Sequence, residues 1–213
     1  MFANRADAGR RLASRLTTLP ADELPAGSLV VLGLPRGGIP VAYEIAAALR
    51  APLDVIVVRK IGVPSQPELA MGAIGEGDVR IVNEVVVRRA GISPAQFAEV
   101  EARERTELAR RAARYRTHRD RVPVTGCTAL IVDDGIATGS TARAACQVAR
   151  AQGAARVILA VPIGPPSTIH TLQEVAEEVI SLECPEQFLA IGQFYDDFTA
   201  TSDDEVVRLL GLE

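Results

Sequence analysis

The sequence contains almost no lysine. Of its 23 lysine and arginine residues, Lys60 is the single lysine. A Walker A phosphate loop, a Schiff-base site and a lysine general base each require a lysine side chain. Any of these three mechanisms would therefore have to use Lys60.

Histidine and cysteine are also scarce. The chain has two histidines, His118 and His170, and three cysteines, Cys127, Cys146 and Cys184, and it lacks CxxC and HExxH spacing. We therefore expect neither a structural zinc site nor a zinc-protease site. An odd number of scattered thiols is typical of proteins in a reducing cytosol.

Long apolar runs are absent. Residues 1–16 are charged throughout and lack the apolar centre of a signal peptide. No run approaches the ~18 apolar residues of a membrane-spanning helix. We therefore expect a cytoplasmic protein that does not enter a membrane. The formal net charge of −4 gives little reason to expect a nucleic-acid partner.

The remaining composition is that of a globular protein. The 213 residues are 48% hydrophobic and 23% charged, with 17 glycines and 13 prolines. A chain of this length can bury a full core. Since no repeat or linker divides it, we expect residues 1–213 to form one domain.

Apolar strands alternate with helical segments along the chain. The short Val-rich run at 28–32 is typical of a buried parallel strand, and residues 40–50 and 53–58 complete a strand–helix–strand unit. Residues 59–92 predict a mobile Gly/Pro-rich loop that leads into a hairpin or edge strand at 81–87. The other expected helices are 5–16, 93–115, 139–151, 167–177 and 202–210, and the other expected strands are 128–132, 156–161 and 179–182.

This order predicts an α/β fold with a mainly parallel sheet and helices on both faces. The long helix after Ser93 has a capping box of Ser93 and Gln96, with Pro94 at its first position, and Ser202 and Glu205 form a similar box. Ligands bind such sheets at the carboxyl ends of the strands. Three loops lie there, residues 33–38, residues from 59 onward, and residues 133–141.

The loop at 133–141 carries the strongest chemical signal. An apolar strand runs into Asp133 and Asp134, and a loop of small residues then opens a helix. Backbone N–H groups at a helix N-terminus bind phosphate. Paired carboxylates repel phosphate but accept hydrogen bonds from ribose hydroxyls and keep Mg²⁺ nearby. The alternative is that the two aspartates only cap the helix, although one would be enough for a cap.

Residues 129–141 resemble the phosphoribosyl pyrophosphate signature of the type I phosphoribosyltransferases, which is four apolar residues, two acidic residues and a Gly/Thr-rich loop. The run GLPRGG at 33–38 resembles the pyrophosphate loop of this family, and Arg59-Lys60 with the segment after them resembles its flexible catalytic loop. The resemblance covers about residues 28–160. The whole chain, including its ending GQFYDDF, is similar to a group of predicted phosphoribosyltransferases, of which some stand alone and others are fused to an α/β-hydrolase.

The resemblance implies a division of the chain and a set of roles. The core would be 28–182, with an inserted loop and long helix at 59–121 and a C-terminal hood at 183–213. The residues with implied catalytic roles are Lys60, Arg59 and Arg36. Pyrophosphate would be bound by Arg36, Gly37, Gly38 and Lys60. The ribose 5-phosphate would be bound by Asp133, Asp134, Gly135, Ile136, Ala137, Thr138, Gly139, Ser140 and Thr141.

The resemblance also implies a reaction. With Mg²⁺, held by Asp133 and Asp134 mostly through ribose hydroxyls or water, a nitrogen nucleophile would attack the ribose of 5-phosphoribosyl 1-pyrophosphate and pyrophosphate would leave. Closure of the loop 61–78 would exclude water. Family habit suggests a homodimer.

The acceptor is a small heterocycle whose identity the sequence does not specify. Ala137 stands where 6-oxopurine transferases usually carry an acidic residue, which argues against a hypoxanthine or guanine type. Four of the chain's eight aromatic residues lie at 188–198 and could form a base-stacking platform or an ordinary hydrophobic patch. We take Phe188, Tyr195 and Asp196 as acceptor candidates, and Glu68 as either a loop acid or a capping residue.

Eight arginines lie within residues 103–121. They suggest an alternative function, in which the helix 93–121 of a non-catalytic sensor of phosphoribosyl pyrophosphate binds nucleic acid or a protein partner. The simpler interpretation is a solvated helix face with internal ion pairs, because glutamates are interleaved at suitable spacing. A third reading is a phosphatase or ribose-phosphate hydrolase.

Overall fold

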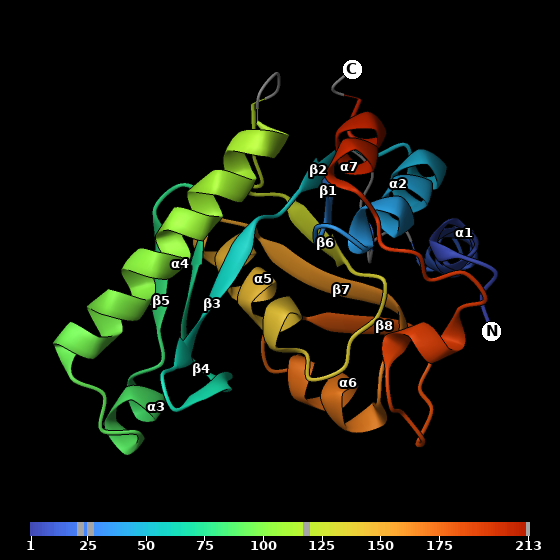
Figure 1. Ribbon diagram of the computed structural model, residues 1–213. Helices are drawn as coiled ribbons and strands as arrows, with labels where there is room; N and C mark the ends of the chain where they lie inside the picture. The colour runs from blue at the N-terminus through green and yellow to red at the C-terminus, as the bar shows by residue number, and fades with distance from the viewer. Residues whose placement is uncertain (21–23, 25–27, 117–119, 212–213) are drawn as a thin grey trace.

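The computed structural model describes residues 1–20, 24, 28–116 and 120–211. Its centre is a five-stranded sheet in which every neighbouring pair of strands is parallel (Figure 1). The order is β2-β1-β6-β7-β8, which confirms the predicted α/β class. The strands are β1 (Leu29–Gly33), β2 (Leu53–Val55), β6 (Thr128–Val132), β7 (Arg156–Ile163) and β8 (Glu178–Glu183).

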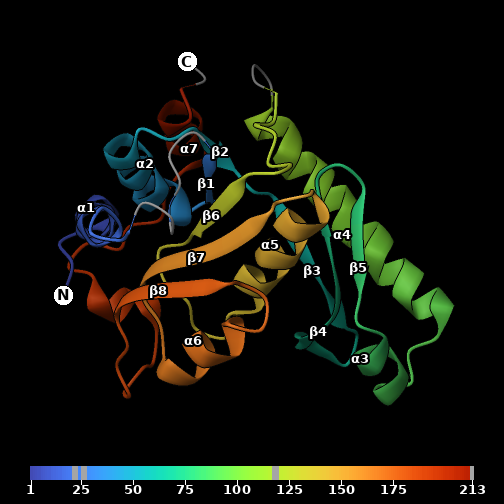
Figure 2. The same cartoon turned by 180° about the vertical axis from the view of Figure 1, so that it is seen from behind.

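Helices cover both faces of this sheet, as Figures 1 and 2 show from opposite sides. Alternate residues of each strand point to opposite faces. Val31 and Leu130 therefore pack with α1 (Arg5–Leu16) and α2 (Gly38–Leu49), while Ile131 packs with α5 (Ser140–Ala151). Near the same face as α5, α6 (Pro166–Leu172) contacts β8.

A second sheet replaces the expected mobile loop at 61–78. Strands β3 (Val58–Val63), β4 (Gln66–Gly75) and β5 (Val79–Val82) form an antiparallel sheet in that order. The prediction of a loop was wrong because Ile61, Met71 and Ile74 bury their side chains on one face of these strands. Tertiary packing thus compensates for the low strand propensity of a Gly-rich segment.

The long helix α4 (Pro94–Tyr115) covers that buried face of the second sheet (Figure 1). Its predicted capping box is present, since Ser93 accepts from the Gln96 N–H and the Gln96 side chain accepts from the Ser93 N–H. Phe97, Val100 and Leu108 are buried against the sheet. The short helices α3 (Glu84–Arg89) and α7 (Asp203–Leu209) complete this flank.

Three other expected elements differ in extent. The strand predicted at 53–58 ends at Val55, because the chain leaves the parallel sheet there and enters the second sheet at Val58. The strand predicted at 81–87 ends at Val82, because the Asn83 side chain accepts from the Val86 N–H and starts α3. The helix predicted at 167–177 ends at Leu172, because Glu177 bonds to the backbone of Val157.

The N-terminus packs against the segment that follows β8, at one edge of the molecule (Figure 1). Phe2 forms a parallel bridge with Tyr195, and the single 3₁₀ turn in the described residues, η1 (Ile191–Phe194), precedes it. Among the described residues, no helix combines the length and the apolar character needed to cross a bilayer.

Candidate active site

The loop between β6 and α5 has the form of an anion cradle. Gly139 has a φ of 71°, in the left-handed region that glycine adopts readily, and it precedes the first residue of α5. The Thr138 and Ser140 hydroxyl oxygens lie 3.2 Å apart, and the side chain of Ile136 is buried in the core. Thr138 and Thr141 are exposed in this loop. Their hydroxyls can donate hydrogen bonds to an anion, in addition to the backbone N–H groups at the start of α5.

The two carboxylates at the start of this loop differ in their partners. Asp134 is 8% exposed, and Arg5 Nε donates to its Oδ2 at 2.7 Å. Asp133 Oδ1 accepts from the Asp134 N–H at 2.9 Å. Burial, together with the neighbouring Asp134 charge, raises the pKa of Asp133 well above its usual value, and burial raises the pKa of Asp134 despite Arg5. Cations or hydroxyl donors at Asp133 would stabilise its ionised form.

The loop at 34–37 packs directly against these carboxylates. A Cβ atom at Gly37 would overlap the Asp134 carboxylate, and one at Gly38 would overlap the Val132 carbonyl. Glycine is therefore required at both positions for this close approach. The structure thus brings Gly37 and Gly38 beside Asp133 and Asp134, which are about a hundred residues away along the chain.

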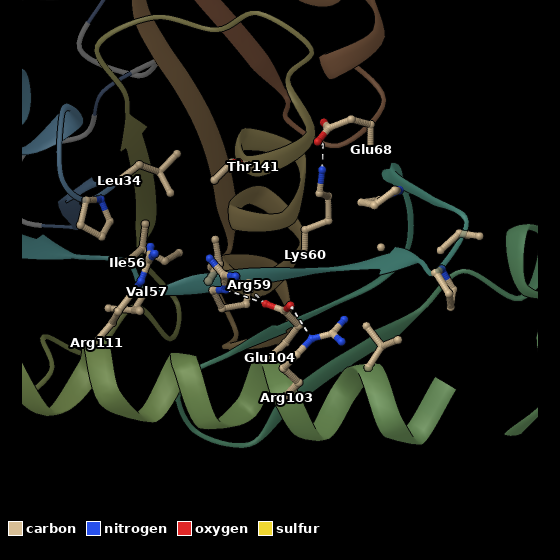
Figure 3. Close-up of a pocket in the computed structure, with 17 residues that line it drawn as sticks. Leu34, Ile56, Val57, Arg59, Lys60, Glu68, Arg103, Glu104, Arg111 and Thr141 are labelled. Carbon is tan, nitrogen blue, oxygen red and sulfur yellow. Dashed lines mark hydrogen bonds and ion pairs between the residues drawn. The ribbon is translucent and has the colours of Figure 1, made fainter. Parts of the chain in front are cut away.

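A cavity of about 400 Å³ lies where the three predicted loops meet (Figure 3). It is lined by Leu34 and Pro35 of the first loop, by Arg59 and Lys60 of β3, and by Thr141 at the start of α5. The carboxyl ends of neighbouring parallel strands deliver these loops to one edge of the sheet. Of the sequence-predicted site residues, Arg59, Lys60 and Thr141 line this space, whereas Arg36, Gly37, Gly38 and residues 133–140 do not.

Both cations of β3 have carboxylate partners. Lys60 Nζ lies 3.0 Å from Glu68 Oε2 across the β3–β4 hairpin, and an Arg59 amino group lies 2.6 Å from Glu104 Oε2 on α4 (Figure 3). Lys60 is the more adaptable of the two, because Glu68 is largely exposed whereas Glu104 is largely buried. Glu68 is thus a residue of β4 and not a helix cap.

Sequence reasoning did not assign α4 to this cavity. Val100, Arg103, Glu104 and Arg111 line it from the helix. Arg103 and Arg111 are eight residues apart, which places them near one helix face, but the sequence does not show what that face covers. The sequence also did not predict that Arg5 bonds to Asp134, because the two residues are far apart in the chain and no local pattern links them.

Arg36 lies beside this cavity and lines an adjoining one. Its side chain is about half exposed, and its amino group is 4.0 Å from Asp203 Oδ1 at the start of α7. α4 supplies most of the lining of this adjoining cavity.

The three acceptor candidates lie in the C-terminal segment, and none of them lines the 400 Å³ cavity. Tyr195 is 6% exposed, and its hydroxyl donates to the Asp134 carbonyl oxygen at 2.6 Å, so the ring has a packing role. Phe188 stacks on Phe194 with a centroid distance of 5.6 Å. Asp196 is exposed. Their role toward an acceptor stays a prediction.

Many of the arginines at 103–121 form ion pairs. Arg105 bonds to Glu101, Arg110 and Arg111 share Glu107, and Arg116 bonds to Asp54 and Glu76, while Arg119 falls outside the described residues. Arg110 and Arg111 lower the pKa of Glu107 to about 2. The pairs support the interpretation of an ion-paired helix face.

The residues present fit a magnesium ion that is held mainly by its substrate. Within the described ranges, no group of three or more His, Cys, Asp or Glu residues is arranged to hold a metal. Protein sites commonly bind Mg²⁺ through one or two carboxylates together with substrate phosphates. Asp133 and Asp134 provide such a pair beside the anion cradle.

The chain is similar to known proteins of one family. Residues 3–199 match the family model of the phosphoribosyl transferase domain. Proteins of two Mycobacterium tuberculosis strains, CDC 1551 / Oshkosh and ATCC 25618 / H37Rv, are each 57% identical over 210 residues, and both names assign them provisionally as phosphoribosyl transferases. The match covers 99% of this chain and 46% of each relative, so the chain spans about half their length.

Solved structures agree with the fold. The crystal structure of a Thermus thermophilus protein is 39% identical, with a TM-score of 0.89 over 98% of this chain and 97% of that chain. An Aquifex aeolicus protein at 12% identity has a TM-score of 0.51 over 96% of this chain and 84% of its own. The latter likeness concerns the fold alone.

Proposed function

This chain belongs to the phosphoribosyl transferase domain family, and we propose that it binds 5-phosphoribosyl 1-pyrophosphate with Mg²⁺ and transfers the phosphoribosyl group to a nitrogenous acceptor. One observation carries the proposal. One cavity of about 400 Å³ is lined by Thr141 of the anion cradle, by Leu34 and Pro35 of the loop that leads to Gly37 and Gly38, and by Arg59 and Lys60 of β3.

Each loop matches one part of that substrate. The cradle from Gly135 to Thr141 would bind the 5-phosphate through backbone N–H groups and hydroxyls. Asp133 would accept hydrogen bonds from the ribose hydroxyls. Asp134 would contribute mainly by placing the loop, because Arg5 and Gly37 already occupy the surroundings of its carboxylate.

The diphosphate would lie toward the loop 34–38 and β3. Arg36, Lys60 and the Gly37 and Gly38 amides would offset its charge, which grows as the bond to the ribose breaks. Bound Mg²⁺ would stabilise the negative charge of the leaving diphosphate, with Asp133 helping to hold it. Lys60 is paired with Glu68, so a bound diphosphate would compete with that ion pair for the ammonium.

In the transfer step, a ring nitrogen of the acceptor attacks C1 of the ribose as the C1–oxygen bond to diphosphate breaks. Its transition state resembles an oxocarbenium ion, by analogy with glycoside chemistry. The cavity walls formed by the β3–β4 hairpin and α4 would keep water from C1. The acceptor stays a small heterocycle of unspecified identity, with Phe188, Tyr195 and Asp196 as the predicted contacts.

Calorimetry with 5-phosphoribosyl 1-pyrophosphate and Mg²⁺ tests the binding step. We expect wild-type protein to bind, and binding to require both Mg²⁺ and the carboxylates. The double substitution Asp133→Asn and Asp134→Asn should abolish measurable binding while leaving the circular dichroism spectrum unchanged. Unchanged affinity in the double variant would refute the site assignment.

A pyrophosphate-release screen over nucleobases and related heterocycles tests the transfer step. Release with one class of acceptor would support a transferase. Binding without release, accompanied by salt-dependent RNA or DNA binding, would instead support a regulatory sensor. Phosphate release without any acceptor would support a hydrolase. The homodimer and the cytoplasmic location stay predictions that this screen does not address.

A further inference from the structure

Four arginines surround a second cavity next to the proposed transfer site. It has a volume of about 300 Å³ and lies between the loop 34–37, the C-terminal half of α4 and the first turn of α7. Its lining consists of Pro35, Arg36, Arg110, Arg111, Arg114, Tyr115 and Asp203. Four guanidinium groups thus face one carboxylate across a small space.

The local acidic residues do not offset this charge completely. Glu107 is shared by Arg110 and Arg111, and Arg114 pairs with Asp203 and Asp204. Arg111 donates through Nε to Glu107, and its terminal amino groups have no other partner within residues 1–20, 24, 28–116 and 120–211. A guanidinium has five N–H donors in a fixed fork, so Arg111 retains donors for an anion.

The surrounding contacts hold the cavity in a defined shape. Tyr115 is buried, and its hydroxyl donates to Asp203 Oδ1 at 2.8 Å, which ties the end of α4 to the start of α7. The same carboxylate lies between Arg114 and Arg36. The arginines are therefore presented by one packed helix, α4, and one short loop, and α7 supplies the carboxylate of Asp203.

This cavity adjoins the 400 Å³ cavity directly. Pro35 and Arg111 line both spaces, and Figure 3 shows Arg111 extending from α4 toward the 400 Å³ cavity. Arg36 belongs to the loop that we assign to diphosphate. A phosphate group in the second cavity would therefore be close to the leaving group of the proposed reaction.

We infer that Arg36, Arg111 and Arg114 form an oxyanion subsite that binds a phosphate group. The small volume suits one phosphate or diphosphate group better than a nucleic-acid strand, and planar guanidinium forks match phosphate oxygens. The phosphate belongs either to the diphosphate of the phosphoribosyl donor or to a separate phosphorylated molecule. The link to group transfer rests on the proposed function, whereas phosphate binding by itself does not.

Calorimetric titration with inorganic pyrophosphate, without Mg²⁺, tests the subsite. Arg111→Gln and Arg114→Gln should each weaken binding about tenfold or more, the loss expected for one charge-assisted contact. Arg105→Gln is a control of equal charge change on the same helix, where Arg105 bonds to Glu101, and it should change affinity less than about twofold, because distant exposed charges are screened. Equal weakening in all three variants, or none in Arg111→Gln and Arg114→Gln, would refute the subsite.

A second control separates charge from folding. Asp204→Asn removes an ion-pair partner of Arg114 but keeps the guanidinium, and Asp204 is highly exposed. It should bind pyrophosphate at least as tightly as wild type, with an unchanged melting temperature. Weaker binding in Asp204→Asn would show that the Arg114 effect is structural, which would contradict the assignment.

A competition experiment identifies the source of the phosphate. If saturating 5-phosphoribosyl 1-pyrophosphate with Mg²⁺ displaces pyrophosphate and Arg111→Gln weakens donor binding, the subsite takes the donor's diphosphate. If pyrophosphate still binds, the subsite takes a separate phosphorylated molecule. Asp133→Asn should abolish donor binding but leave pyrophosphate binding intact, so that failure of the proposed function and failure of the subsite give different results.

Discussion

At residue 134, a carboxylate that is 8% exposed depends on a guanidinium from the first helix. Arg5 donates to Asp134, reaches the Thr199 carbonyl oxygen at 2.7 Å, and lies 3.9 Å from the centroid of the Phe198 ring. Tyr195 donates to the Asp134 carbonyl oxygen. One aspartate of the motif therefore connects the cradle to the N-terminal helix and to the segment 195–199.

Arg5→Gln should destabilise the protein strongly, because it leaves the buried Asp134 carboxylate without its cation. We expect a loss of about 3–5 kcal/mol in the free energy of unfolding, measured by urea denaturation. Adding Asp134→Asn removes the uncompensated charge and should recover much of this loss. Additive losses in the double variant would show that the pair is not coupled.

Lys60→Ala should lower kcat far more than it lowers affinity for the phosphoribosyl donor. The Lys60 ammonium faces the proposed diphosphate, whose charge is greatest in the transition state, so we expect a loss of about 100- to 1000-fold in kcat. Steady-state pyrophosphate release and calorimetry measure the two quantities separately.

Two controls accompany the lysine. Lys60→Arg should not restore full activity, because a planar guanidinium cannot replace a compact ammonium. Glu68→Gln releases Lys60 from its ion pair and should leave kcat unchanged or higher. Full activity in Lys60→Ala would contradict a catalytic role for Lys60.

At the scale of elements, α4 is the wall shared by both cavities, and it is fixed at its two ends. Ser93 caps its start, and Arg116 follows its last residue. Arg116 bonds to Asp54 of β2 at 2.6 Å and to Glu76 at 2.8 Å, and Asp54 is fully buried. The helix is thereby joined to the parallel sheet as well as to the second sheet.

Arg116→Gln should destabilise the protein by about 3–5 kcal/mol, because it leaves the Asp54 carboxylate buried without a cation. Arg110→Gln is the matched control, since Arg110 is exposed and its surface pair with Glu107 should contribute little to stability. Urea denaturation measures both. Losses of similar size would mean that Arg116 contributes no more than a surface ion pair.

At the scale of the whole molecule, α5 sets the position of one sheet relative to the other. It packs on the parallel sheet and also against β3 and β4. Gly75 of β4 lies so close to Val148 of α5 that a Cβ atom there would overlap the valine side chain. This contact determines how near the second sheet, which carries Arg59 and Lys60, lies to the cradle.

Gly75→Ala should force the two layers apart at a cost of about 1–3 kcal/mol, typical of overpacking. It should also lower pyrophosphate release, because Lys60 moves with the second sheet. Adding Val148→Ala makes room for the new methyl group and should recover stability and activity together. Denaturation and release assays on the single and double variants check this, and a neutral Gly75→Ala would contradict it.

Local patterns account for the parts that the sequence predicted. The apolar run of β6, the carboxylates after it and the small-residue loop are contiguous, so periodicity and residue chemistry are sufficient to place the cradle. The Ser93 capping box is local in the same way. Residues 61–78 were misassigned because their glycines indicate a loop, whereas their strand structure depends on burial against α4.

The sequence by itself therefore determined the α/β class, the order of the main strands and helices, and the loop that marks the family, because all of these follow from short-range signals. The tertiary structure decided that Arg5 neutralises Asp134, that Tyr195 is buried beneath the same loop, and that α4 brings arginines to the loop of Arg36. Such contacts join residues far apart in the chain, and their energies depend on burial and on the distance between charges, which arise only when the elements pack.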